Sequence, residues 1–212
     1  QNLGEMVGID LEAGGVRTIA DLTTETFLER GGTTAGRAPT ERIETRIWEE
    51  GLYEGEFCDL MAVGTRWVEG CYCLPDAALK GALSTIAKNY RYVLIDSPAG
   101  LEHLNRKIST VVDVIFDLVS PSSRSFGHVR RAQRIVREVG IEARRFYLVG
   151  AFLFPESEED RLRREFPHAY LGKIPYDPLL SEYVLSGRSL LEVPDESPAY
   201  RAVAEILAKA GY

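Results

Sequence analysis

Short apolar runs alternate with amphipathic segments along most of this chain of 212 residues. The apolar runs are short enough for strands, whereas the amphipathic segments repeat their apolar residues at helical spacing. We expect strands at 57–64, 92–96, 111–119, 146–150 and 169–174. We expect helices at 40–50, 76–89, 123–139, 158–165, 178–186 and 197–210, the last with Ser197 as its N-cap. Strands that alternate with helices predict right-handed βαβ units, and therefore an α/β fold with a doubly wound, mostly parallel sheet.

The loops that follow the strands are where chemistry is expected, because ligands bind beyond the carboxyl ends of the strands in an open parallel sheet. The run 92–96 ends on Asp96, and a turn-forming stretch leads on to Gly100. A carboxylate delivered there by a buried strand can hold Mg²⁺ through water or orient the water that attacks a phosphate. Gly100 would let the loop move with a γ-phosphate and act as a switch. The alternative is that Asp96 only caps the turn that follows it.

Several segments carry a resemblance to a known family. Asp96–Gly100 resembles the second switch of the MinD-type ATPases, and Leu101–Leu104 resembles the CooC family, which matures carbon monoxide dehydrogenase by inserting nickel. Gly172–Pro178 resembles the loop that closes over the nucleotide base in the same superfamily, and Asn2–Glu5 resembles the segment after its second strand. The segments occur in the family's order over nearly the whole chain. The resemblance implies a P-loop ATPase fold, ATP and Mg²⁺ as cofactors, and a catalytic switch formed by Asp96 and Gly100.

The resemblance also implies a base pocket lined by Pro175, Tyr176 and Asp177. The family commonly carries an asparagine just after the strand that corresponds to 146–150, where it reads the adenine. Ala151 and Phe152 occupy that place here. The asparagine's part in selecting the base therefore has no counterpart in this sequence.

The phosphate-binding loop of the family has the pattern G-x-x-x-x-G-K-[ST], which does not occur in these 212 residues. The resemblance implies that the chain lacks the family's first strand, P-loop and second strand, and that 1–212 is a single domain incomplete at its N-terminus. Without the loop's N–H groups and lysine the β- and γ-phosphates lose their cradle, so we expect the chain as given not to hydrolyse ATP efficiently. The alternative is a relative that uses the scaffold only to bind a partner and hydrolyses nothing.

A cysteine pair, Cys71-Tyr72-Cys73, precedes the helix expected at 76–89. Residues two apart in an extended segment point the same way, so both thiolates can face one Zn²⁺ or Ni²⁺ ion and fill half of a tetrahedral site. A two-fold dimer would complete the four ligands. The alternatives are two buried thiols, or a redox pair, whose disulfide would be strained. The CooC resemblance implies the metal site between subunits, whereas Cys58, inside the run 57–64, is expected in the core.

Composition narrows the class of protein further. The net charge of −7 argues against broad nucleic-acid binding, and no apolar run approaches the roughly 18 residues of a membrane span. Three cysteines are too few for a disulfide framework and suit a reducing cytoplasm. The leading interpretation is a cytoplasmic, homodimeric, ATP-dependent metallochaperone with carbon monoxide dehydrogenase or a similar nickel enzyme as client, and with neither nucleic acid nor membrane as partner. The other interpretation is a positioning ATPase of the MinD class.

Overall fold

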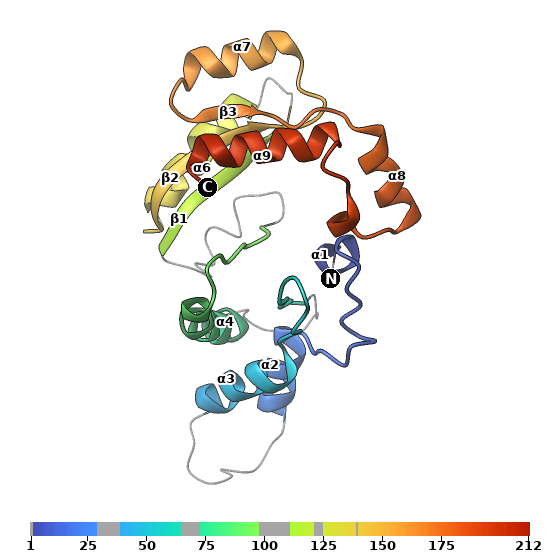
Figure 1. Cartoon of the computed structure of the whole chain (residues 1–212). Coiled ribbons are helices and arrows are strands. Elements are labelled where there is room, and N and C mark those ends of the chain that lie inside the picture. Colours follow the sequence, from blue (N-terminus) through green and yellow to red (C-terminus); the bar gives the residue numbers. More distant parts are fainter. Residues whose placement is uncertain (1, 29–38, 65–72, 98–110, 121–124, 139) are drawn as a thin grey trace. The chain divides into compact units, whose positions relative to one another are not determined.

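The computed structural model describes residues 2–28, 39–64, 73–97, 111–120, 125–138 and 140–212 (Figure 1). Contacts divide the chain into two compact units, Gln1–Glu5 with Ile9–Ser109 and Met6–Gly8 with Thr110–Tyr212. Each unit has a buried apolar cluster of its own. The single domain expected over 1–212 stays a prediction.

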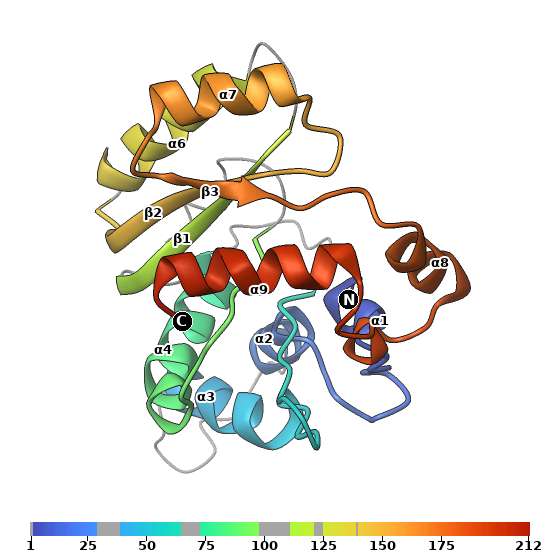
Figure 2. The ribbon, with the colours of Figure 1, turned by 45° about the horizontal axis from the view of Figure 1, so that its top comes forward.

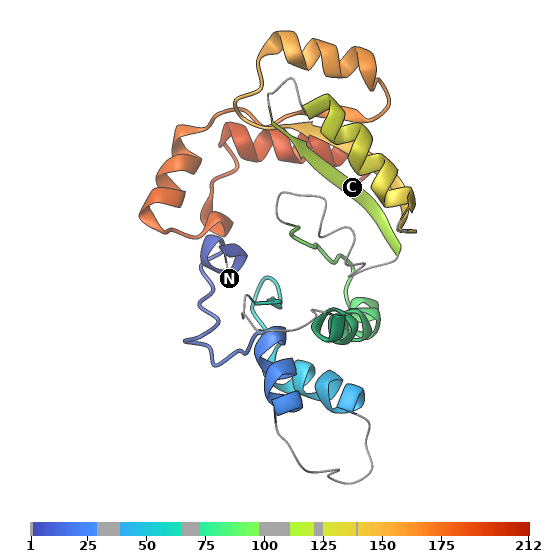
Figure 3. The ribbon, with the colours of Figure 1, turned by 180° about the vertical axis from the view of Figure 1, so that it is seen from behind.

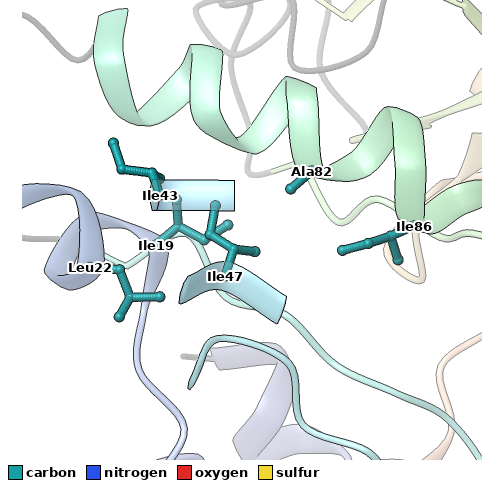
Figure 4. Close-up of a cluster of buried hydrophobic side chains, with 6 residues drawn as sticks. All are labelled: Ile19, Leu22, Ile43, Ile47, Ala82 and Ile86. Atoms are coloured by element: carbon teal, nitrogen blue, oxygen red, sulfur yellow. The ribbon is translucent and has the colours of Figure 1, made fainter. Parts of the chain in front are cut away.

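Helices dominate the first unit. It contains α2 (Ile19–Leu28), α3 (Pro39–Glu50), α4 (Cys73–Ile86) and the 3₁₀ turn η1 (Ala87–Asn89), while α1 (Asn2–Met6) lies at the start of the chain. Side chains from α2, α3 and α4 meet in one buried cluster (Figure 4). Its members are Ile19, Leu22, Ile43, Ile47, Ala82 and Ile86. The helices expected at 40–50 and 76–89 are confirmed within a few residues at their ends.

The prediction of a strand at 57–64 is wrong. Its backbone makes one isolated antiparallel bridge, in which Tyr53 and Leu60 exchange two N–H···O bonds of 2.9 Å. The carbonyls of Ala62 and Val63 accept hydrogen bonds from the first turn of α2, at 3.0 and 2.9 Å, because helix N-termini leave N–H groups unsatisfied. The segment therefore caps a helix instead of joining a sheet. Cys58, expected in the core, is exposed.

The strand expected at 92–96 is also absent among the described residues. The segment has no helix or strand assignment, and every residue from 91 to 97 is exposed. Leu94 is 92% exposed, although it lies in the middle of an apolar run. A strand needs a neighbouring strand for its ladder, and the described part of the first unit contains only the single bridge at Tyr53.

The second unit contains a three-stranded parallel sheet in the order β1-β2-β3. The strands are β1 (Val111–Val119), β2 (Glu142–Gly150) and β3 (Tyr170–Lys173). The helices are α6 (Ser125–Glu138), α7 (Glu156–Glu165), α8 (Pro178–Ser186) and α9 (Pro198–Ala210), with the 3₁₀ turn η2 (Leu190–Glu192) between the last two. The predicted α/β class with a parallel sheet is confirmed. β2 starts four residues before the expected 146, because its polar first residues pair with β1 from Val111↔Glu142 onward.

Helices cover both faces of this sheet. Figure 2 shows α6 and α7 on one face and α9 on the other, and Figure 3 shows the same layers from behind. Beneath α6 and α7 lies a buried cluster made of Val119, Phe126, Val129, Leu148, Phe154 and Leu162. On the other face, Lys209 of α9 donates to the carbonyl of Leu171 at 3.0 Å.

Candidate functional site

The carboxyl ends of β2 and β3 lie side by side in the second unit. Backbone hydrogen bonds continue past both strands: Ala151 N–H donates to the carbonyl of Val119 at 2.9 Å, and Ile174 N–H donates to that of Gly150 at 2.9 Å. A Cβ on Gly150 would lie 2.9 Å from the Cβ of Lys173, so the two strands approach closely at this point. The loops that begin at 151 and 174 therefore start from one rigid edge, where parallel sheets bind ligands.

Two aromatic side chains from these loops lie next to each other. The ring centroids of Phe152 and Tyr176 are 6.1 Å apart and the ring planes are inclined by 42°. Phe152 is 53% exposed and Tyr176 is 60% exposed, whereas Phe154, two residues after Phe152, is buried in the core. The structure thus places Tyr176, one of the residues expected to line a base pocket, beside the residue that stands near the family's asparagine position.

Asp177, the next expected base-pocket residue, is buried and joins two helix N-termini. Its Oδ1 accepts the N–H groups of Leu179 at 2.9 Å and Leu180 at 3.4 Å, and so caps α8. Its Oδ2 accepts the Ser197 hydroxyl at 2.5 Å and the Ala199 N–H at 3.1 Å, at the start of α9. Ser197 in turn accepts the Tyr200 N–H at 3.1 Å.

The environment of Asp177 favours its ionised form. The hydrogen bond from Ser197 lowers the pKa of the carboxyl, burial opposes that shift, and the N–H groups of α8 and α9 add to it. Because both oxygens bind helix N-termini, Asp177 positions the loop that carries Pro175 and Tyr176. The sequence carried a signal for this role that we did not use: Asp177-Pro178 repeats the cap pattern of Ser197-Pro198.

A lysine ends β3 and is held by a buried glutamate. Lys173 Nζ lies 3.2 Å from Glu159 Oε2, and Arg163 lies 2.7 Å from the other oxygen. Burial raises the pKa of Glu159, but the hydrogen bonds from Arg163 and Lys173 outweigh it, so the pKa is lowered. These contacts fix the end of β3 from the side of α7.

Asp117, inside β1, was not singled out from the sequence. Its Oδ2 is buried and has no hydrogen-bond partner among the described residues, and its Oδ1 lies 3.9 Å from Nε2 of His128 on α6. Burial raises the pKa of Asp117, and the nearby His128 opposes the shift. The sequence does carry a sign of this buried carboxylate, because Asp117 interrupts the apolar run Val114–Val119.

The remaining expected site residues belong to the first unit. Asp96 is exposed at the end of the segment 92–96. Gly100 and Cys71 lie outside the described residues, and Cys73, of which only the backbone is described, is the first residue of α4. The described part of the chain brings no three His, Cys, Asp or Glu side chains together as a metal site. The assignments of Asp96, Gly100, Cys71 and Cys73 as site residues stay predictions.

None of the described helices is long and apolar enough to span a membrane. No protein-family model matches the sequence. Over 212 residues the chain is 32% identical to the uncharacterized ATP-binding protein MJ0685 of Methanocaldococcus jannaschii, an alignment that covers 98% of this chain and 82% of that protein. Over 139 residues it is 30% identical to the carbon monoxide dehydrogenase accessory protein CooC of Rhodospirillum rubrum, covering 65% of this chain and 51% of that protein.

A solved structure shares the fold. The MinD cell division protein of Aquifex aeolicus matches with a TM-score of 0.64 and 18% identity, over 99% of this chain and 80% of that one. At this identity the likeness speaks for the fold alone. Together with the match to MJ0685, which covers most of both chains, it shows that the chain belongs to a family of ATP-binding proteins built on the MinD-like P-loop ATPase fold.

Proposed function

We propose that this protein is an ATP-dependent accessory ATPase that handles a transition metal, with nickel insertion into a carbon monoxide dehydrogenase or a similar enzyme as its task. The observation that carries the nucleotide part is the paired edge of β2 and β3. There the loop Pro175–Asp177 lies beside Phe152, and Asp177 is fixed by two helix N-termini. The match to an ATP-binding relative over nearly the whole chain supports ATP as the ligand of that edge.

Asp96 and Gly100 have the role of reporting the nucleotide state in this proposal. Mg²⁺ keeps several waters and takes only one or two protein carboxylates together with the phosphates, so the single exposed carboxylate of Asp96 suits it. Gly100 allows the following loop to change conformation when the γ-phosphate leaves. Efficient hydrolysis also needs a phosphate-binding lysine, and the G-K-[ST] pattern that supplies it is absent from these 212 residues.

The cargo is a metal ion held by Cys71 and Cys73. Cys73 is the first residue of α4, and Cys71 stands two positions earlier in the sequence. A helix N-terminus favours the thiolate that binds metal. Two thiolates per chain complete a tetrahedral site only in a dimer, so ATP-driven dimerisation would assemble the site and release would hand the ion on. The similarity to CooC, a carbon monoxide dehydrogenase accessory protein, supports nickel as the cargo and that enzyme class as client.

The nucleotide part is tested by equilibrium dialysis with ATP, in Mg²⁺ and in EDTA. We expect the chain to bind ATP, and Asp96→Asn to remove most of the Mg²⁺ enhancement. Asp195→Asn, a substitution at another exposed acidic residue, is the matched control and should bind as the wild type does. Absence of binding up to about 1 mM ATP, the upper end of ordinary enzyme–substrate affinities, would contradict the proposal.

The metal part is tested on protein that is loaded with Ni²⁺ or Zn²⁺ and desalted in the presence of Mg²⁺ and ATP, because ATP drives the dimer that completes the site. Elemental analysis gives the metal content and light scattering gives the mass. We expect one ion per dimer, and a large loss of both metal and dimer in the Cys71→Ser, Cys73→Ser double variant. Cys58→Ser is the control, because Cys58 is a free, exposed thiol at a different place in the chain. Equal metal content in the double variant and the wild type would contradict a cysteine site and favour a positioning ATPase without metal.

A further inference from the structure

The exposed side of α6 consists mostly of arginine. Four apolar residues at helical spacing are buried on its other side, which fixes the rotation of the helix about its axis. They are Phe126, Val129, Ala132 and Val136. Among the α6 residues whose burial is described, the exposed ones are Gly127, Arg130, Arg131, Arg134, Arg137 and Glu138. The helix therefore presents four arginines and one glutamate to solvent.

Only part of this positive charge is neutralised within the chain. Arg130 and Arg134 are each paired with a glutamate, at 2.9 and 3.8 Å, and their side chains are still 69% and 64% exposed. Arg131 and Arg137 form no ion pair with another residue in the part of the chain that the structure describes. The α6 surface thus keeps a positive charge that is available to a ligand.

We propose that the arginine face of α6, made of Arg130, Arg131, Arg134 and Arg137, is a docking site for an acidic segment of a partner protein. The inference goes beyond the proposed function, because it uses neither the nucleotide edge nor the cysteine pair. Each guanidinium presents a rigid fork of N–H donors that matches a carboxylate, and residues three and four apart are neighbours on a helix surface. A chain whose net charge is already −7 does not need these arginines for solubility.

The neighbouring helix α7 determines which kind of acidic ligand fits. It lies beside α6 on the same face of the sheet (Figure 2), and the guanidinium of Arg161 lies 4.0 Å from the ring centroid of Phe126. α7 carries five acidic and three basic residues, and the acidic residues of its first turn are Glu156, Glu158 and Glu159. The positive charge is therefore confined to one helix.

This confinement favours a protein segment over nucleic acid or membrane. A nucleic acid or an anionic membrane presents negative charge over an area wider than one helix, whose diameter is about 10 Å, and would also meet the carboxylates of α7. A short run of Asp and Glu residues can lie along α6 alone. Complementary charge of this kind steers association and selects the partner.

The test is binding of a fluorescein-labelled peptide of about 16 residues with the repeat Glu-Glu-Ala-Ala, long enough to span α6, followed by fluorescence anisotropy at low salt. We expect the Arg131→Glu, Arg134→Glu variant to weaken binding by about tenfold or more, because repulsion replaces attraction. Arg188→Glu, Arg201→Glu reverses two exposed arginines elsewhere in the second unit and makes the same change of net charge. This matched control should bind the peptide as the wild type does.

Arg131→Gln, Arg134→Gln removes the charge without adding repulsion, and should weaken binding by about threefold. A peptide with Gln in place of Glu should not bind. Equal binding of the acidic peptide by the wild type and the Arg131→Glu, Arg134→Glu variant would overturn the docking site, as would equal weakening in the control. Absence of binding up to about 1 mM peptide would overturn it too. Duplex DNA or anionic vesicles that bind as tightly as the peptide, through the same arginines, would overturn the assignment to a protein partner.

Discussion

The strand β1 and the segment 92–96 are both short apolar runs that precede a turn, yet only β1 is a strand. β1 pairs in parallel with β2 along its length, and its last residue, Val119, is 2% exposed. The segment 92–96 has no strand pairing among the described residues, and its central Leu94 is 92% exposed. An apolar run thus indicates a segment that gains from burial, but a ladder of hydrogen bonds requires a neighbour whose backbone groups are available.

The largest effect that separates the two regions concerns Leu148, which pairs with Asp117 of β1 and is fully buried beneath α6 and α7. We expect Leu148→Ala to lower the free energy of unfolding by about 2–5 kcal/mol, because it leaves a cavity in a packed core. Urea unfolding followed by far-UV circular dichroism measures this. Leu153→Ala, at an exposed leucine, should stay within about 0.5 kcal/mol. A loss below about 1 kcal/mol for Leu148→Ala would mean that the sheet region is no better packed than the segment 92–96.

A smaller effect is expected at the N-cap of α9, the helix that covers the second face of the sheet. Ser197→Ala should reduce the free energy of unfolding by about 1 kcal/mol, since it removes the bond to Tyr200 N–H. Ser186→Ala, whose hydroxyl only bonds within α8, serves as the control and should show little change.

The same variant has a consequence for acid stability. The bond from Ser197 is the main cause of the lowered pKa of Asp177. A carboxyl whose folded pKa is depressed contributes stability that is present above the unfolded pKa, about 4, and is lost as pH falls through the folded pKa. In Ser197→Ala that loss should begin at higher pH. An acid-unfolding midpoint equal to that of the wild type would show that the Ser197–Asp177 bond is not formed in solution.

Asp117 is a buried carboxyl group within β1, and its ionisation lowers the free energy of unfolding. The segment 92–96 has no such buried group. The pKa of Asp117 is raised by burial, so above the folded pKa the protein carries a buried charge that opposes folding. We expect Asp117→Asn to stabilise the protein at pH 7 by up to about 1 kcal/mol. The wild type should recover this difference as pH falls from the raised folded pKa towards the ordinary value near 4, because the folded state then binds the extra proton.

Urea midpoints of the wild type and Asp117→Asn between pH 8 and pH 4 measure that difference. His128, on α6, is the charged neighbour that faces Asp117, and Leu148, its partner on β2, is uncharged. His128→Gln therefore serves as a companion variant and should deepen the wild-type penalty, because it removes the side chain that opposes the raised pKa of Asp117. If the difference in urea midpoint between the wild type and Asp117→Asn does not change with pH, Asp117 is not a buried group that ionises in this range.

Periodicity predicted the elements of the second unit well because those elements find partners within it. The expected bounds of 111–119 and 178–186 and the cap at Ser197 agree with β1, α8 and α9. Periodicity could not predict which hydrogen bonds individual polar groups make. The carbonyls of Ala62 and Val63 cap α2, and the carboxylate of Asp177 joins two helices. Those roles depend on which groups the fold brings together, as does the meeting of Phe152 with Tyr176, which are 24 positions apart in the sequence.

The smallest expected effect is at the segment 92–96 itself. Leu94→Ser should change the free energy of unfolding by no more than about 0.5 kcal/mol, because an exposed side chain has little packing to lose. The measurement is the same urea transition as for Leu148→Ala, with Asp96→Asn as a neighbouring substitution at a second exposed position. A loss of about 2 kcal/mol or more would mean that Leu94 is buried in solution, and so that the run 92–96 does pair as a strand. That result would remove the contrast with β1, since the two runs would then differ only in which neighbour each of them has.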